Sequence, residues 1–297
     1  MRVRGRPSCS WAYKRHVPVG LLALLAGRHL IPPGERDPHR TLDWPGLALL
    51  VLGLPAALYG ATMIGAEEIN ATAVSALAIG LTLILVFVLT ATRKQRPPIL
   101  DLRLLAIRRF RAATATCGLT GANMYAGLLL LPLYFQTSAG LGATATGLLL
   151  LALGLGSALV LPLAGALTDR HGPGRVSLAG VTLLVVTTLP FLLTETIPLS
   201  ALVALLVLRG AGLALAQMPA MTAAYTAVSA RQMGDATTLV NIVQRIGGAL
   251  GAITVVVMLT QTGDGYWWAF AGLLVIALLN VVSAVGLTSR HEAMIHS

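Results

Sequence analysis

The chain has 297 residues, of which 56% are hydrophobic and only 11% are charged, and its mean hydropathy is +0.80. Soluble domains have about 25% charged residues, so this composition excludes an ordinary soluble enzyme and also a disordered chain. The net charge of +10 would indicate nucleic-acid binding in a soluble protein. Membrane proteins instead gather Lys and Arg on one side of the bilayer, so the placement of the charges decides between these interpretations.

Eight long apolar stretches run through the chain, and a ninth, residues 17–31, is short. A bilayer-spanning helix takes about 20 apolar residues, and none of these stretches has the alternating polarity of a barrel strand. The sequence therefore predicts an all-α fold, a polytopic bundle of transmembrane helices. The eight stretches are residues 44–64, 71–91, 112–136, 143–168, 176–194, 199–228, 236–260 and 266–287.

The bases of the connections predict the orientation of the chain. Residues 92–111 hold seven Lys and Arg residues, and Arg170, Arg175 and Arg231 follow in connections on the same side. The connections on the other side of this region hold Glu and Asp but neither Lys nor Arg. Because Lys and Arg mark the cytoplasmic side, we predict a multi-pass protein of the plasma membrane with a cytoplasmic C-terminus. Residues 99–105 alternate apolar and charged side chains, which predicts a short interfacial helix.

The N-terminus breaks this alternation. Residues 1–16 carry five Lys and Arg residues, although counting back along the spans places them outside. Either residues 17–31 do not span the bilayer, or residues 1–16 are a poor start for the protein. A basic stretch before an apolar one also mimics a signal peptide, but no clean cleavage site follows.

The most specific motif is the sequence GALTDRHGPGR at residues 165–175, in one of the basic connections. It resembles the G-x-L-x-D-R-x-G-x-x-R signature of the major facilitator superfamily. We expect Gly165 to allow two helices to approach closely, and Gly172 and Gly174 to form a tight turn with positive φ. Asp169 is expected to pair with an Arg or to accept hydrogen bonds from a helix N-terminus. The motif residues, with a gating or structural role, are Gly165, Asp169, Arg170, Gly172 and Arg175; the alternative is an ordinary tight loop with cytoplasmic bases.

A second match lies in an apolar stretch. The sequence LRGAGLA at residues 208–214 resembles the R-G-x-G element of the same superfamily. A charge inside a membrane helix costs at least ~2.5 kcal/mol, so Arg209 needs a partner or a water-filled cavity. The alternative is an Arg near the membrane edge whose guanidinium extends to the surface.

The wider resemblance covers residues 16–287. HVPVGLLA at residue 16, LDWPG at 42, RPPILDLRLL at 96 and QRIGGALG at 244 look like elements of the fourteen-helix drug/proton antiporter branch. The resemblance implies helices six to fourteen, the C-terminal portion of that architecture. The implied segments are a basic tail at 1–16, a partial helix and cytoplasmic connection at 17–43, two linker helices at 44–91, a cytoplasmic connection at 92–111, a six-helix C-terminal half at 112–288 and a cytoplasmic tail at 289–297.

The first five helices of that branch have no counterpart in the chain. Fourteen spans of ~30 residues would need about 420 residues, so we interpret the chain as truncated, either by a start inside a longer frame or by a disrupted gene. The resemblance implies efflux of multiple drugs or small amphipathic solutes driven by the proton gradient, with a missing N-terminal half as partner. The alternative is a non-transporting remnant or a partner subunit of a split transporter. No apolar stretch carries a deeply placed Asp or Glu as proton carrier.

Two stretches show polar or small residues at helical spacing, as expected for a substrate path. Thr116, Thr120, Asn123 and Gly127 follow one spacing, and Thr237, Asn241, Gln244 and Gly248 repeat it. Helix–helix packing through small and hydroxyl residues is the alternative. The candidates for a substrate cavity are Asn123, Asn241, Gln244 and Arg209.

Other classes of function find no support in the sequence. The eight stretches hold no His, no paired carboxylates and no HExxH motif, and the chain has no GxxxxGK[ST] loop, so neither an intramembrane enzyme nor a nucleotide-driven pump is expected. Cys9 and Cys117 stand far apart without metal-ligand spacing. We therefore predict no enzyme activity, no metal or other cofactor and no nucleic-acid partner; the partners are the lipid bilayer and a small-molecule substrate.

Overall fold

The computed structural model describes residues 44–65, 71–93, 102–194, 197–261 and 265–288. All of them lie in one compact unit, Asp43–Ser297, and these residues form helices and short connections without a strand. The all-α fold is thus confirmed for this part of the chain. Residues 17–31, the ninth stretch, lie outside the described residues.

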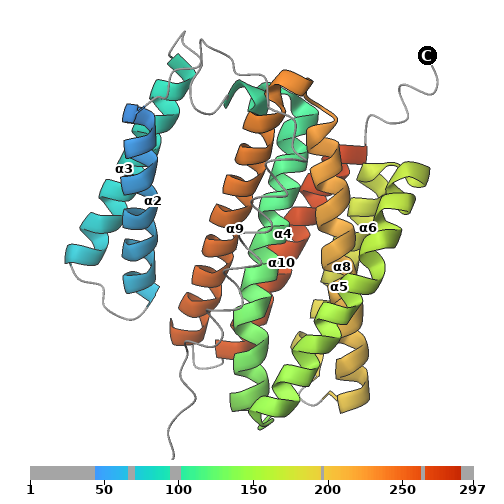
Figure 1. The fold of residues 1–297 in the computed structure, drawn as a ribbon. Helices are drawn as coiled ribbons and strands as arrows, with labels where there is room; N and C mark the ends of the chain where they lie inside the picture. The colour runs from blue at the N-terminus through green and yellow to red at the C-terminus, as the bar shows by residue number, and fades with distance from the viewer. Residues whose placement is uncertain (1–43, 66–70, 94–101, 195–196, 262–264, 289–297) are drawn as a thin grey trace, which may run out of the picture. The chain divides into compact units, whose positions relative to one another are not determined.

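Each of the eight long apolar stretches forms a helix (Figure 1). Six of the segments are long and apolar enough to cross a membrane, and α2 and α3 are 22 and 23 residues long. A short 3-10 helix, η1, stands where the interfacial helix was predicted. The elements are α2 (Trp44–Gly65), α3 (Ala71–Arg93), η1 (Leu102–Ala106), α4 (Arg108–Leu133), η2 (Tyr134–Ser138), α5 (Ala143–His171), α6 (Pro173–Thr188), α7 (Pro190–Leu193), α8 (Leu199–Tyr225), η3 (Ala230–Gln232), α9 (Met233–Gln261) and α10 (Gly265–Thr288).

Two of the spans continue beyond a local irregularity. The π-helical turn η2 extends α4 just after Pro132, and α7 extends α6 from Pro190. Proline removes a backbone donor and crowds the preceding turn of a helix, so an irregular turn at each of these places has an evident cause.

Helices α4 to α10 pack into one bundle, in which α4 contacts α8, α9 and α10 while α8 contacts α5 and α6. The seam between α4 and α9 is lined with glycines. A methyl group on Gly247 would collide with the backbone of Gly118, and one on Gly251 would collide with the backbone of Ala122. Small residues let membrane helices approach backbone to backbone, so this seam is among the closest contacts in the bundle.

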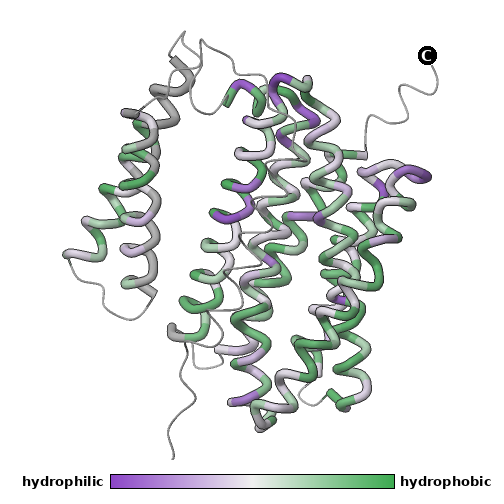
Figure 2. Tube along the Cα trace, viewed as in Figure 1, coloured by the Kyte–Doolittle hydropathy of each residue, from purple (hydrophilic) through white to green (hydrophobic). Residues whose placement is uncertain are grey.

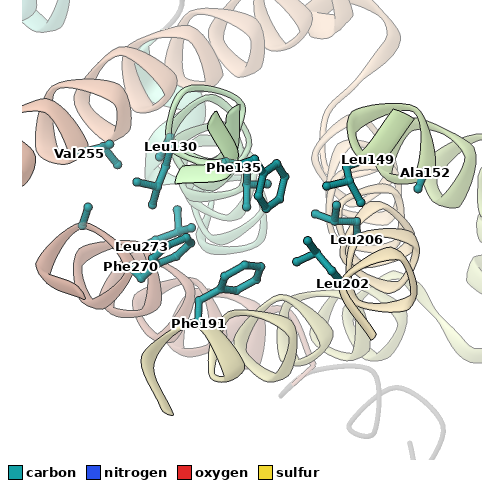
Figure 3. Packing of buried hydrophobic residues seen from close by; sticks show 13 residues of the cluster. Leu130, Phe135, Leu149, Ala152, Phe191, Leu202, Leu206, Val255, Phe270 and Leu273 are labelled. Carbon is teal, nitrogen blue, oxygen red and sulfur yellow. The ribbon is translucent and has the colours of Figure 1, made fainter. Parts of the chain in front are cut away.

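An apolar cluster fills one end of the bundle, where α4 ends and α8 and α10 begin (Figure 3). The rings of Phe191 and Phe270 stack with their centroids 4.6 Å apart, and Tyr134 meets Phe270 edge to face at 5.3 Å. Such ring pairs add stability beyond the area that they bury. The cluster joins residues of α4, α5, α7, α8, α9 and α10 and holds these helices together.

A second apolar cluster lies at the opposite end, where α4 and α9 begin and α8 ends. It joins Leu104 of η1 to Phe110, Cys117 and Val240, all of which are fully or almost fully buried. Polar side chains occupy the bundle between the two clusters. Figure 2 shows these hydrophilic positions as isolated bands within otherwise hydrophobic helices.

Candidate functional site

The described bases of the bundle are unevenly distributed. Residues 102–288 contain nine Arg and no Lys. Seven of them stand at the end where α4, α6 and α9 begin: Arg103, Arg108, Arg109, Arg111, Arg170, Arg175 and Arg231. The other two, Arg209 and Arg245, stand near the middle of α8 and α9. This distribution agrees with the charge pattern from which the orientation was predicted.

The connection between α5 and α6 forms the turn that the motif predicts. Gly172 has a φ of 82° and ends α5, and Pro173 then occupies the first position of α6. This order suits both residues, because glycine adopts positive φ without a steric penalty and proline is preorganised for a helix start.

The structure corrects the expected roles of the other two glycines. Gly174 belongs to α6 and lacks a positive φ; a methyl group there would crowd the backbone of Leu287 and Thr288 in α10. Gly165 is exposed, and a methyl group there would meet nothing within 4 Å among the described residues. The close approach of helices was therefore predicted at the wrong glycine of the motif.

The charged residues of the motif lie at the bundle surface. Asp169, Arg170 and Arg175 are exposed. Asp169 makes no hydrogen bond or ion pair with the described residues, so its predicted pairing is absent from this part of the chain. The gating role of the motif remains a prediction.

Arg209 occupies the interior of the bundle and is 2% exposed. Its Nη1 donates a hydrogen bond to Oγ1 of Thr188 at 2.8 Å, and its Nη2 donates to Oδ1 of Asn123 at 2.6 Å. Asn123 in turn donates from Nδ2 to the carbonyl of Leu273 at 3.2 Å. One arginine therefore links α8 to α6, α4 and α10.

This arrangement decides between the two interpretations of Arg209. Arg209 is the eleventh residue of the 27-residue α8 and is buried, so its guanidinium does not extend to the membrane surface. Both of its hydrogen-bond partners are neutral oxygens, while Nε has no partner among the described atoms. Gly127 leaves room for the group, since a methyl group there would lie 3.1 Å from Nη2.

The remaining polar residues on this side of α4 also bind other helices. Asn280 of α10 donates a hydrogen bond to Oγ1 of Thr120 at 2.9 Å, and the hydroxyls of Thr116 and Ser283 lie 3.0 Å apart. The polar pattern of α4 thus forms interhelical hydrogen bonds, as the packing alternative expected. Asn280, which is not among the residues predicted from the sequence, belongs to this network.

The polar pattern of α9 has different surroundings. Asn241 is exposed and, within the described part of the chain, bonds only the backbone of its own helix, the carbonyl of Thr237, at 2.8 Å. Gln244 is half-buried, and its neighbour Arg245 is exposed. The Nη1 of Arg245 donates to the hydroxyl of Tyr125 on α4 at 2.5 Å.

The four predicted cavity residues therefore fall into two groups. Asn123 and Arg209 bond each other inside the bundle, whereas Asn241 and Gln244 lie on the more open side of α9. Their role in a substrate cavity remains a prediction. Sequence reasoning missed Arg245, although a base at the thirteenth position of a 29-residue apolar helix was a signal for it. The described residues contain no cluster of side chains suited to a metal ion.

Comparison with known proteins indicates a family and shows what share of its relatives' length the chain covers. The family model described as Major Facilitator Superfamily matches residues 11–252 and 112–294. A "Multidrug resistance protein B homolog" of Mycobacterium tuberculosis is 30% identical over 256 residues, which cover 84% of this chain and 47% of the relative.

Two other relatives have names that refer to antibiotics. "Puromycin resistance protein pur8" of Streptomyces alboniger is 31% identical, with 81% of this chain and 49% of the relative covered. "Lincomycin resistance protein LmrB" of Listeria monocytogenes is 25% identical, with 86% of this chain and 55% of the relative covered. The chain spans about half the length of these curated relatives.

Proposed function

Because the chain belongs to the major facilitator superfamily, we propose that it forms part of a membrane transporter that exports small amphipathic compounds. The proposal combines the resistance proteins among its relatives with one observation: Arg245 is exposed near the middle of a membrane-spanning helix. A cation that faces the hydrocarbon of a bilayer is unfavourable by at least ~2.5 kcal/mol. A water-filled passage along this side of α9 removes that cost, and such a passage is what a transporter needs.

In this proposal, the bundle end with seven arginines faces the cytoplasm of a cell with the chain in its plasma membrane. Trp267 and Trp268, which are about half exposed at the opposite end, then lie at the outer interface, where aromatic residues are favoured. The energy source is the proton gradient, as the family resemblance implies. The two described carboxylates, Asp169 and Asp235, are at helix ends, so the proton carrier has to be a group outside the middle of the described spans.

A cellular efflux measurement tests this function. Residues 1–297 are expressed in a bacterial strain without its main exporters, alone or together with the part of the M. tuberculosis relative that the chain does not match. Because the chain spans about half of that relative, we expect unchanged accumulation of ethidium with the chain alone and lower accumulation with the two parts together.

Each other outcome has a defined meaning. Lower accumulation with the chain alone would contradict the need for a second part. Unchanged accumulation in both cases, with the chain verified in the membrane, would favour the alternative of a non-transporting remnant. Dissipation of the proton gradient with a protonophore then tests the energy source.

A further inference from the structure

The guanidinium of Arg245 is only partly satisfied. Its hydrogen bond to the hydroxyl of Tyr125 occupies Nη1, and the described residues offer Nη2 and Nε no partner. Arg245 is also exposed, so these N–H groups are accessible from the side of α9. An arginine with its two free nitrogens on one edge has the geometry that binds a carboxylate through two parallel hydrogen bonds.

Tyr125 is held in a position where it can also donate a hydrogen bond to a carboxylate. Its hydroxyl accepts the hydrogen bond from Arg245, so its own proton is free to be donated. The ring lies directly over Gly248, where a methyl group would collide with it, and Gly121 packs against the backbone and side chain of Gln244. These contacts between α4 and α9 fix the phenol beside the guanidinium.

The described surroundings supply no negative charge to Arg245. Among the described residues, the carboxylates are those of Asp169 and Asp235. Both stand at the end of a helix, away from the middle of the spans. Arg209 cannot serve as an alternative site, because its Nη atoms are bonded internally and the side chain is 2% exposed. An anion that reaches the middle of the described spans therefore meets one accessible cation.

We propose that Arg245 and Tyr125 form a subsite that binds the carboxylate of a transported compound. The guanidinium donates through Nη2 and Nε and Tyr125 donates its hydroxyl proton, while Gln244 and Asn241 border the subsite on the same side of α9. This inference rests on the proposed function and adds to it: a carboxylate on a transported amphipathic compound gains a contact that a neutral or cationic compound lacks.

A matched pair of probes tests the charge selectivity. The full chain is placed in nanodiscs of a zwitterionic lipid, and binding of 2-naphthoate and 2-naphthamide is measured by equilibrium dialysis against empty nanodiscs. The two compounds have nearly the same shape and differ in charge. We expect the carboxylate to bind at least about tenfold more tightly, since charge-assisted hydrogen bonds are roughly twice as strong as neutral ones.

Variants assign the effect to the subsite. Arg245→Gln is expected to abolish the preference for the carboxylate and to leave amide binding within about twofold. Arg245→Lys retains the charge without the planar fork and is expected to keep part of the preference. Tyr125→Phe removes one donor and should lower carboxylate affinity by about fivefold. Arg231→Gln removes a charge from the connection before α9 and is the control, with no change expected.

Three results would overturn the inference. Equal binding of amide and carboxylate would leave solute binding intact but remove the charge selectivity. A preference that survives in Arg245→Gln, with its circular dichroism unchanged, would place the anion elsewhere. Binding of neither probe would also overturn the subsite, while the proposed export function would still be judged independently by the efflux of ethidium, a cation.

Discussion

Arg209 and Arg245 carry the same charge near the middle of two neighbouring spans, yet their environments differ in almost every respect. Arg209 is buried and bonds two side-chain oxygens, one from α6 and one from α4. Arg245 is exposed and bonds one phenol. The first guanidinium has become a connector of the bundle, whereas the second retains donors for a molecule from outside.

The difference teaches that a polar residue in a membrane helix is informative only together with its exposure. A buried polar group must find partners within the protein, and α4 supplies Thr116, Thr120 and Asn123 for that purpose. An exposed charge at the same depth cannot be explained by packing, so it points to water, a ligand or another polar surface.

The largest expected effect of a substitution is at the buried arginine. Arg209→Ala leaves Asn123 and Thr188 without their donor and opens a cavity, so we expect a loss of about 3 kcal/mol of unfolding free energy. Thermal unfolding in detergent can be followed through the thiol of Cys117, which is buried and reacts with a maleimide dye only after unfolding.

Arg245→Ala is the matched control for this measurement. Both variants are made in a Cys9→Ser background, so that Cys117 is the one remaining thiol. The exposed side chain has little packing to lose, so we expect a change of less than about 0.5 kcal/mol. Equal destabilisation by the two variants would erase the distinction between a structural and an accessible arginine.

An intermediate effect is expected in chemical accessibility. In vesicles, a cysteine introduced by Arg245→Cys should react with a charged, membrane-impermeant methanethiosulfonate at least about tenfold faster than the native Cys117, because reaction needs a solvated thiolate. Cys117 thus serves as the buried reference within the same molecule. Reaction of both thiols at the same slow rate would show that lipid or protein covers this side of α9.

The smallest expected effects are the changes in stability caused by substitution of two asparagines. Asn280→Ala removes an interhelical hydrogen bond to Thr120 and is expected to cost about 1 kcal/mol of stability. Asn241→Ala removes a bond within α9 from an exposed side chain and should cost less than about 0.5 kcal/mol. The same Cys117 assay measures both, and a reversed order would contradict the assignment of the two polar surfaces.

The helices and their ends could be predicted from the sequence because they depend on local chemistry. Long apolar runs, Gly172 and Pro173 carry that information within a few residues. The partners of Arg209 could not be predicted, since Asn123 is 86 residues away in the chain and nothing local connects the two. The errors at Gly165 and Gly174 have the same origin, because a close approach depends on which helix lies opposite.

Arg245 was overlooked for another reason. The stretch QRIGGALG resembles a family element, and that resemblance alone gives no reason to ask what offsets a charge in an apolar helix. Arg209 and Arg245 both lie near the middle of an apolar helix, so the need for a partner or for water applies equally to each. The depth of a charge in an apolar helix is therefore a more general guide than the motif around it.

The glycine seam between α4 and α9 has a mechanical consequence. The backbones are in direct contact along Gly118, Gly247 and Gly251, so no flexible side chains between them could adjust to a displacement of one helix against the other. We therefore expect α4 and α9 to move together as one rigid unit. Tyr125 on α4 and Arg245 on α9 then keep their spacing during any rocking motion of the bundle. The orientation of the pair relative to the two sides of the membrane can then change while its own geometry stays constant.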